Sequence, residues 1–348
     1  MTEYCVVCID DEISTGSPRD NAINLLSERD FLKVLKLHPT KVIDWLKDKE
    51  LEPDMFVVDF RLNASALDGE TFPFKGTSLV GMIRDVFPQV PVYLLSAFFE
   101  DKHSAKEVDI FDRLITENNF LQPGFILSDV RDFDGIKNSI PGGIQNLLAL
   151  LRSPESSVDD LRNVLPRDFT SDLEDETVEI EGLETESTFE FSGIVRFGRW
   201  VQRPLLADEG ILCGDVHASV LLGMDIGYFM NDFLPSEEGA KFVQQTKYTG
   251  IFSDTSKRRW WKQAIFNYIY SHPNSQGEIV DELPTSSPTI LNVPEEQRAK
   301  CIVCREAFPQ VVGSTDGLEL YPVHRSCSEL DPKAQVLPFF DHPRLIEG

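Results

Sequence analysis

Acidic and hydroxyl side chains follow directly behind three short apolar runs in the first hundred residues. Asp10 and Asp11 follow the run YCVVCI, Asp59 follows MFVV, and Ser96 follows VPVYLL. If these runs are parallel strands of one sheet, their carboxyl ends meet at one edge, and the four side chains converge there. Clustered carboxylates repel one another unless a cation lies among them, and Mg²⁺ prefers oxygen ligands. The pattern predicts an acidic site for Mg²⁺.

A second set of metal-ligand residues has the spacing C-x2-C-x19-H-x2-C, formed by Cys301, Cys304, His324 and Cys327. Three thiolates and one imidazole suit Zn²⁺, and a site closed by four protein ligands is structural. Residues 295–348 hold too few apolar side chains for a robust core, so the metal would supply much of the folding free energy. The motif resembles small treble-clef or zinc-ribbon modules. In the alternative interpretation these cysteines are ordinary buried thiols and the histidine is a polar loop residue.

The elements that must position the acidic side chains can be predicted from the hydrophobic pattern. From residue 1 to about residue 153, short apolar runs alternate with amphipathic stretches. This alternation is typical of a parallel sheet with helices on both faces. We therefore expect a doubly wound α/β domain over residues 1–153.

Four blocks of this region, VVCIDDE, DMFVVDFRL, GTSLVGMIR and VPVYLLSA, resemble the successive signature blocks of two-component receiver domains. The resemblance covers about the first 150 residues and implies a flavodoxin-like fold. It implies that Asp10 and Asp11 bind Mg²⁺, that Asp59 accepts a phosphoryl group, and that Ser96 contacts that group. The main-chain carbonyl of Arg61 would be the remaining protein ligand of the metal.

In such a site the Asp59 carboxylate attacks phosphorus while Mg²⁺ neutralises the phosphoryl oxygens, which leaves an acyl phosphate. Ser96 then donates a hydrogen bond to the phosphoryl group and moves the surface behind it. Two features depart from the family. Thr116 stands where the family has a lysine, so the expected cation is missing, and Lys102 or Lys106 are the candidates to replace it. The loop after Asp59, NASALDGETFPFKG, is far longer than the family's short turn, and we interpret it as a lid.

The remaining chain divides by composition. Residues 154–187 read as an acidic linker, because the part from 168 to 186 holds nine acidic residues and no basic one. We expect a central α+β domain of unassigned fold over 188–280, with a strand-like TFEFSGIVRF and a helix from Ser256 to Ser271. Residues 281–294 carry three prolines and read as an extended linker before the zinc module at 295–348.

The block ILCGDVHAS in the central region resembles the strand-then-GDxH block of metallophosphoesterases, in which Asp215 and His217 would bind a metal. The later Gly-Asp and Asn-His-Glu blocks of that family are missing from the sequence. An ordinary loop after a strand is the alternative.

The run KRRWWK at 257–262 is the one basic-aromatic cluster of the sequence. Such clusters can follow a nucleic-acid backbone and stack bases. In our interpretation the two tryptophans belong to the apolar stripe of the predicted helix and the cations are solvated. We also hypothesise that Arg258 and Arg259 dock the acidic segment 168–186 or an acidic partner.

The composition limits the partners. Thirty-three Lys and Arg against 58 Asp and Glu give a net charge of −25, which repels phosphate backbones and anionic lipids. We expect neither a nucleic-acid nor a membrane partner. The sequence has no apolar run of about 18 residues and no signal-peptide pattern, so we expect a cytoplasmic protein. Six cysteines are too few for a disulfide framework in this chain.

These observations favour a response-regulator-like protein of two-component signalling. A histidine kinase or another phosphodonor would act upstream, and a protein partner would bind downstream. In the main alternative, the domain is a pseudo-receiver scaffold whose acidic site never carries phosphate. In a third interpretation, the receiver gates a metal-dependent hydrolase in residues 188–280, which would make the chain an enzyme.

Overall fold

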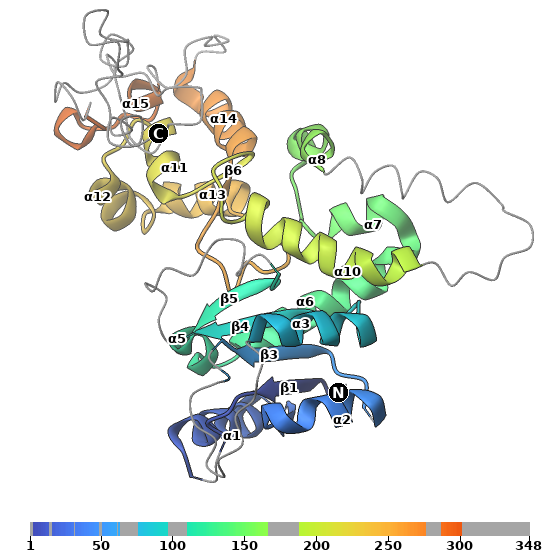
Figure 1. Ribbon diagram of the computed structural model, residues 1–348. Coiled ribbons are helices and arrows are strands. Elements are labelled where there is room, and N and C mark those ends of the chain that lie inside the picture. Colours follow the sequence, from blue (N-terminus) through green and yellow to red (C-terminus); the bar gives the residue numbers. More distant parts are fainter. Residues whose placement is uncertain are drawn as a thin grey trace, which may run out of the picture. The chain divides into compact units, whose positions relative to one another are not determined.

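A computed structural model of the chain (Figure 1) describes residues 3–13, 16–30, 32–48, 51–60, 62, 76–96, 110–165, 188–275 and 287–300. The chain divides into two compact units. The first, which we call the sheet unit, comprises Met1–Leu151, Leu165–Pro204 and Asp254–Ser256. The second, the helical unit, comprises Arg152–Val164, Leu205–Ser253 and Lys257–Gly348.

Five parallel strands form the centre of the sheet unit in the order β2-β1-β3-β4-β5. This is the order of a doubly wound flavodoxin-like sheet, which confirms the α/β prediction. The strands β1, β3 and β4 are apolar at nearly every position because helices cover both faces of such a sheet. The strand bounds are β1 Cys5–Ile9, β2 Lys33–Leu37, β3 Met55–Asp59, β4 Val92–Ser96 and β5 Arg113–Thr116.

Helices pack on both faces of this sheet. On one face, Val7, Phe56 and Val92 share a core with Val42 of α2 and Ile83 of α3. On the other face, the sheet contacts α6 through Tyr93, whose hydroxyl donates to Asp129 Oδ2 at 2.8 Å. The helices of this unit are α1 Pro18–Asp30, α2 Pro39–Asp48, α3 Gly76–Val86, α5 Glu117–Leu121, α6 Phe125–Ser139, α7 Gly143–Ala149 and α10 Thr188–Trp200, with a 3-10 turn at Ile140–Gly142.

The helix α10 corrects two predictions. The segment TFEFSGIVRF, predicted as strand-like, is helical, and its buried residues Ile194 and Phe197 have helical spacing, which Val201 continues just after α10. It belongs to the sheet unit because it packs on α6. A Cβ at Gly198 would lie 2.3 Å from the ring of Phe133, so the two helices approach closely. The predicted central domain 188–280 is therefore wrong for residues 188–204.

The helical unit has an aromatic core. Phe229, Phe233, Phe242, Trp260 and Tyr268 pack together with ring centroids 5.0–6.0 Å apart. Its elements are α8 Val158–Val164, β6 Leu212–Cys213, α11 Asp215–Leu221, α12 Ile226–Tyr228, α13 Glu237–Thr246, β7 Trp260–Trp261, α14 Lys262–Ser271 and α15 Ser287–Ile290. Short 3-10 helices cover Glu155–Ser157, Pro273–Ser275 and Glu295–Gln297, and π-helical turns cover Val201–Leu205 and Phe229–Phe233.

Two further predictions are wrong in this unit. The helix predicted from Ser256 begins only at Lys262, because Trp260 and Trp261 form the strand β7 antiparallel to β6. The second half of the predicted linker 281–294 is folded, since Ile290 and Val293 are buried in the aromatic core. No helix among the described residues is both long and apolar enough to cross a membrane.

Candidate functional site

Three predicted site residues lie at the carboxyl ends of adjacent strands. Asp10 directly follows β1, Asp59 is the last residue of β3, and Ser96 is the last residue of β4. The strands run parallel in the order β1-β3-β4, so these residues share one edge of the sheet. The side chains of Asp10, Asp11 and Ser96 are buried. This edge therefore gathers carboxylates with little access to water.

A cation that the sequence analysis missed lies among these carboxylates. Arg19 Nε is 2.8 Å from Asp10 Oδ2, and Arg19 Nη2 is 4.0 Å from Asp59 Oδ1. A third carboxylate, Glu117 Oε1, is 3.6 Å from Arg19 Nη1. The Arg19 side chain is 9% exposed, against 15% for Asp59 and 47% for Glu117. One buried guanidinium thus faces three acidic side chains from three different elements.

The N-terminal turn of α1 determines where Arg19 lies. The hydroxyl of Ser17 accepts the backbone N–H of Asp20 at 2.9 Å, which is an N-cap, and Arg19 is the second residue of the helix. A cation in the first turn opposes the helix dipole, so the helix itself does not favour Arg19 there. Its position is explained by the carboxylates of the sheet edge.

The polar atoms of the site are incompletely paired. The backbone N–H of Glu12 donates to Asp10 Oδ1 at 2.7 Å. Burial raises the pKa of Asp10, while this hydrogen bond and Arg19 act in the opposite direction. Asp10 Oδ2 and Arg19 Nη1 are buried and make no hydrogen bond of good geometry, although both lie at ion-pair distance from a partner. Ion pairs rather than well-aligned hydrogen bonds therefore hold these two atoms.

Thr116, at the position of the family's lysine, has a local role. Its hydroxyl accepts the backbone N–H of Asn119 at 3.2 Å, and the Asn119 side chain accepts the N–H of Thr116 at 3.3 Å. These two bonds form a capping box at the start of α5. The cation of the site therefore comes from α1 rather than from the end of β5. Lys102, Lys106, Arg61 and loop residues 63–75 lie outside the described residues.

A glycine fixes the backbone of Asp59. A Cβ at Gly76, the first residue of α3, would lie 2.6 Å from the carbonyl oxygen of Asp59. A side chain there would push against backbone atoms, which cannot rotate away. Only glycine allows α3 to begin this close to the end of β3.

The predicted Mg²⁺ would need free oxygen ligands at this edge of the sheet. The oxygens of Asp10, Asp11 and Asp59 have the chemistry that Mg²⁺ prefers. However, Arg19 holds Asp10, and no group of three or more His, Cys, Asp or Glu in the described part of the chain is arranged to hold a metal ion. As arranged, these residues do not fit the ion. The predicted zinc ligands Cys301, Cys304, His324 and Cys327 lie outside the described residues.

The hydrolase-like block of the helical unit is held by ion pairs. Asp215 is the first residue of α11. Its Oδ1 accepts hydrogen bonds from Arg258 Nε at 2.8 Å and from Trp260 Nε1 at 2.7 Å, and its Oδ2 accepts one from Arg258 Nη2 at 3.0 Å. Both oxygens are thus bonded within the unit, and they tie α11 to β7.

The other half of this block is also paired. His217 Nδ1 lies 3.5 Å from Glu209 Oε2, and Arg259 Nη1 donates to Glu209 Oε1 at 2.7 Å. Arg259 also donates to the carbonyl oxygens of Leu206 and Ala207. The prediction that the cations of the KRRWWK run are solvated is therefore wrong for Arg258 and Arg259, which bind carboxylates of their own unit. Residues 168–186 lie outside the described residues.

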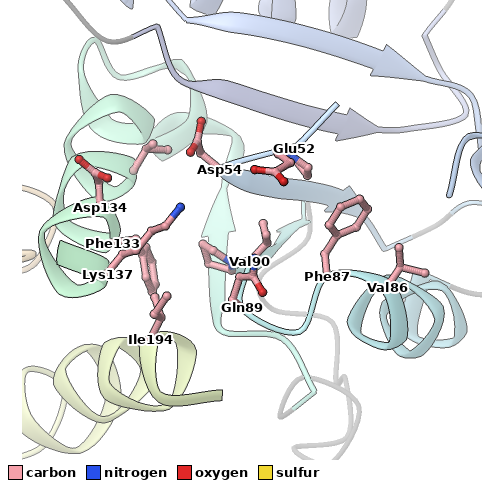
Figure 2. A pocket seen from close by; sticks show the side chains of 13 residues that line it. Glu52, Asp54, Val86, Phe87, Gln89, Val90, Phe133, Asp134, Lys137 and Ile194 are labelled. Carbon is pink, nitrogen blue, oxygen red and sulfur yellow. The ribbon is translucent and has the colours of Figure 1, made fainter. Parts of the chain in front are cut away.

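A cavity of about 300 Å³ lies at the opposite edge of the sheet (Figure 2), where β3 and β4 begin. Asp54, Asp134 and Lys137 line it beside the apolar side chains of Phe133 and Ile194. Asp54 Oδ2 accepts the backbone N–H of Cys5 at 2.7 Å, so this carboxylate joins β3 to β1. The cavity is remote from Asp10 and Asp59, because parallel strands have their amino and carboxyl ends at opposite edges.

Comparison with known proteins adds the following. No protein-family model matches the chain, and no curated protein matches it. Among solved structures, the chain is similar to the response regulator TrrA of Thermotoga maritima at 15% sequence identity and a TM-score of 0.24. The match covers 32% of this chain and 85% of the TrrA chain. It is also similar to the response regulator RcsB of Salmonella typhimurium at 15% sequence identity and a TM-score of 0.27, with 47% of this chain and 68% of the RcsB chain covered. A third similar structure is an adenylate cyclase from Rhodopirellula baltica, at 15% sequence identity and a TM-score of 0.25, with 33% of this chain and 76% of the cyclase chain covered. The strand order, rather than these likenesses, establishes the fold.

Proposed function

We propose that this chain is a signalling protein in which Asp59 of the receiver-like sheet unit accepts a phosphoryl group. A histidine kinase or another phosphodonor would act upstream, and a protein partner would read the changed surface. The observation that carries the proposal is the buried Arg19 guanidinium, 2.8 Å from Asp10 and 4.0 Å from Asp59. It supplies the cation that a phosphoryl site needs and that position 116 does not provide.

The chemistry is an in-line displacement at phosphorus. A carboxylate oxygen of Asp59 attacks the phosphorus of a phosphohistidine or an acyl phosphate. The new P–O bond forms as the bond from phosphorus to the donor breaks, and the donor leaves with the electron pair as imidazole or carboxylate. Arg19 stabilises the negative charge on the phosphoryl oxygens, since charge-assisted hydrogen bonds from guanidinium to phosphate are strong. Ser96 donates its hydroxyl to the same group.

Mg²⁺ at Asp10, Asp11, Asp59 and the Arg61 carbonyl is a separate proposal. Binding there requires Arg19 to leave Asp10, because both cations claim the same carboxylate. No step above depends on the ion.

The test is incubation with acetyl phosphate followed by intact mass measurement. We expect the mass of one phosphoryl group on the wild type and none on Asp59→Asn. Asp44→Asn is the matched control, because Asp44 is 80% exposed on α2 of the same unit. A wild-type chain that stays unlabelled with both acetyl phosphate and a phosphohistidine donor would reject phosphoryl acceptance. Labelling that survives in Asp59→Asn would reject Asp59 as the acceptor.

The Asp10–Arg19 ion pair also favours a second candidate, a phosphorylation-independent scaffold. An acidic site in which an arginine of the same chain is paired with a buried carboxylate can hold one conformation without phosphate. In that case acetyl phosphate leaves partner binding unchanged, and Asp59→Asn binds the partner as the wild type does.

A further inference from the structure

The geometry points to Arg19 as the resident cation of the acidic site, which competes with divalent metal ions for Asp10. The inference deepens the proposed function, because it concerns the regulation of the same site, but it is tested without any phosphodonor. It makes one side chain responsible for how strongly the site binds Mg²⁺.

The competition follows from the place of the guanidinium. Arg19 Nε is 2.8 Å from Asp10 Oδ2, and both side chains are less than a tenth exposed. A Mg²⁺ ion on the same oxygen would stand at about 2.1 Å from it. Two cations on one carboxylate oxygen repel each other strongly where little water screens them. Asp10 can therefore hold Arg19 or the metal ion, but not both.

Arg19 can form an ion pair with another carboxylate when it leaves Asp10. Glu117 Oε1 lies 3.6 Å from Arg19 Nη1, and the Glu117 side chain is about half exposed. The first turn of α1 opposes the positive charge of Arg19 through the helix dipole. Glu117 and Asp59 are thus available as partners of Arg19 when it leaves Asp10. Displacement by a metal ion is physically accessible.

The geometry of these ion pairs leaves bonding capacity on both side chains. Asp10 Oδ2 and Arg19 Nη1 make no hydrogen bond of good geometry although both are buried. A carboxylate oxygen with unused acceptor capacity suits a metal ion, and a guanidinium N–H whose carboxylate partner is 3.6 Å away can turn to a phosphoryl oxygen. The same pair of atoms can serve either ligand once they separate.

The experiment is a MgCl2 titration by calorimetry and by thermal melting, at constant ionic strength, without phosphodonor. We expect Arg19→Gln to bind Mg²⁺ about tenfold or more tightly than the wild type. The gain should disappear in Arg19→Gln with Asp10→Asn. Arg131→Gln is the matched control, because Arg131 is an exposed arginine on α6 of the same unit.

Equal Mg²⁺ affinity of wild type and Arg19→Gln would overturn the inference. If Arg19→Gln does not fold, Arg19→Lys replaces it. Lysine keeps the charge but lacks the planar fork of the guanidinium, so its hold on Asp10 is weaker and Mg²⁺ affinity should rise above that of the wild type. A folded Arg19→Lys with wild-type affinity would also overturn the inference. Failure of Asp59 to be phosphorylated leaves these results unaffected, so the two proposals fail separately.

Discussion

Glu209 is the carboxylate whose loss should change the pH dependence of stability most clearly. It accepts a hydrogen bond from Arg259 Nη1 at 2.7 Å and from the backbone N–H of Gly214 at 3.0 Å, next to His217. Burial alone would raise the pKa of Glu209, but these three partners lower it from the ordinary 4.5 to about 2. The carboxylate is therefore stabilised in its charged form by the folded helical unit.

The sign and size of the effect follow from linkage. Because the folded pKa lies below the unfolded one, the stabilisation is fully present above pH 4.5 and is lost as the pH falls toward 2. At about 1.4 kcal/mol per tenfold change in proton affinity, the upper limit is about 3.4 kcal/mol. The Glu209 side chain is 26% exposed, so water screens part of this interaction. We expect about 1.5–2 kcal/mol at neutral pH.

The assay is urea unfolding of wild type and Glu209→Gln from pH 7 to pH 3, followed by tryptophan fluorescence. Glutamine stands for the protonated carboxyl group, so the difference in the free energy of unfolding should fall by more than half by pH 3. Glu237→Gln is the control, because the Glu237 side chain is 91% exposed in the same unit. A difference that stays constant over this pH range, or that is absent at pH 7, would refute the reasoning.

Three further predictions concern the sheet unit and the zinc motif. Arg113 is 17% exposed and lies 2.6 Å from the fully buried carboxylate of Asp129. Asp129→Ala removes this counter-ion and should lower the free energy of unfolding in urea by about 3–5 kcal/mol. Gly76→Ala places a Cβ 2.6 Å from the carbonyl oxygen of Asp59 and should reduce acetyl phosphate labelling. Gly81→Ala on the same helix, with open space around its Cβ, should keep the labelling. Metal analysis of the purified chain should find about one zinc per chain, and replacing one motif cysteine by serine should remove it.

The sheet could be predicted because its strands carry a strong signal. Val6, Phe56 and Leu94 belong to runs that are buried on both faces, and such runs are continuous rather than alternating. Parallel order then places Asp10 and Asp59 at one edge without any knowledge of side-chain contacts. The convergence of acidic residues is a property of topology, which the pattern of runs and helices largely determines.

The cation of the site could not be predicted in the same way. Arg19 reaches Asp10 only because α1 begins beside this edge of the sheet. The one sequence signal was its place two residues after Ser17, in a first turn that disfavours cations. Such a residue indicates a partner outside its own helix, but it does not say which one.

Short segments with mixed periods account for the errors in secondary structure. TFEFSGIVRF alternates over its first four residues and becomes helical in spacing only from Ile194 onward. The spacing of apolar residues favours Trp260 and Trp261 on the stripe of α14, although adjacent tryptophans can equally occupy both faces of a two-residue strand. In both cases the window was too short for periodicity alone to decide.

Among the described residues, Asp215 and the carboxylates around Arg19 differ in how they are bonded. Both oxygens of Asp215 accept hydrogen bonds from Arg258 and Trp260, so this carboxylate is fully used in holding α11 to β7. At the sheet edge, Asp10 Oδ2 and Arg19 Nη1 are buried without a hydrogen bond of good geometry. Burying such groups is unfavourable unless a partner satisfies them. At the sheet edge one buried guanidinium faces carboxylates from three elements, and the proposed phosphoryl chemistry would use this arrangement.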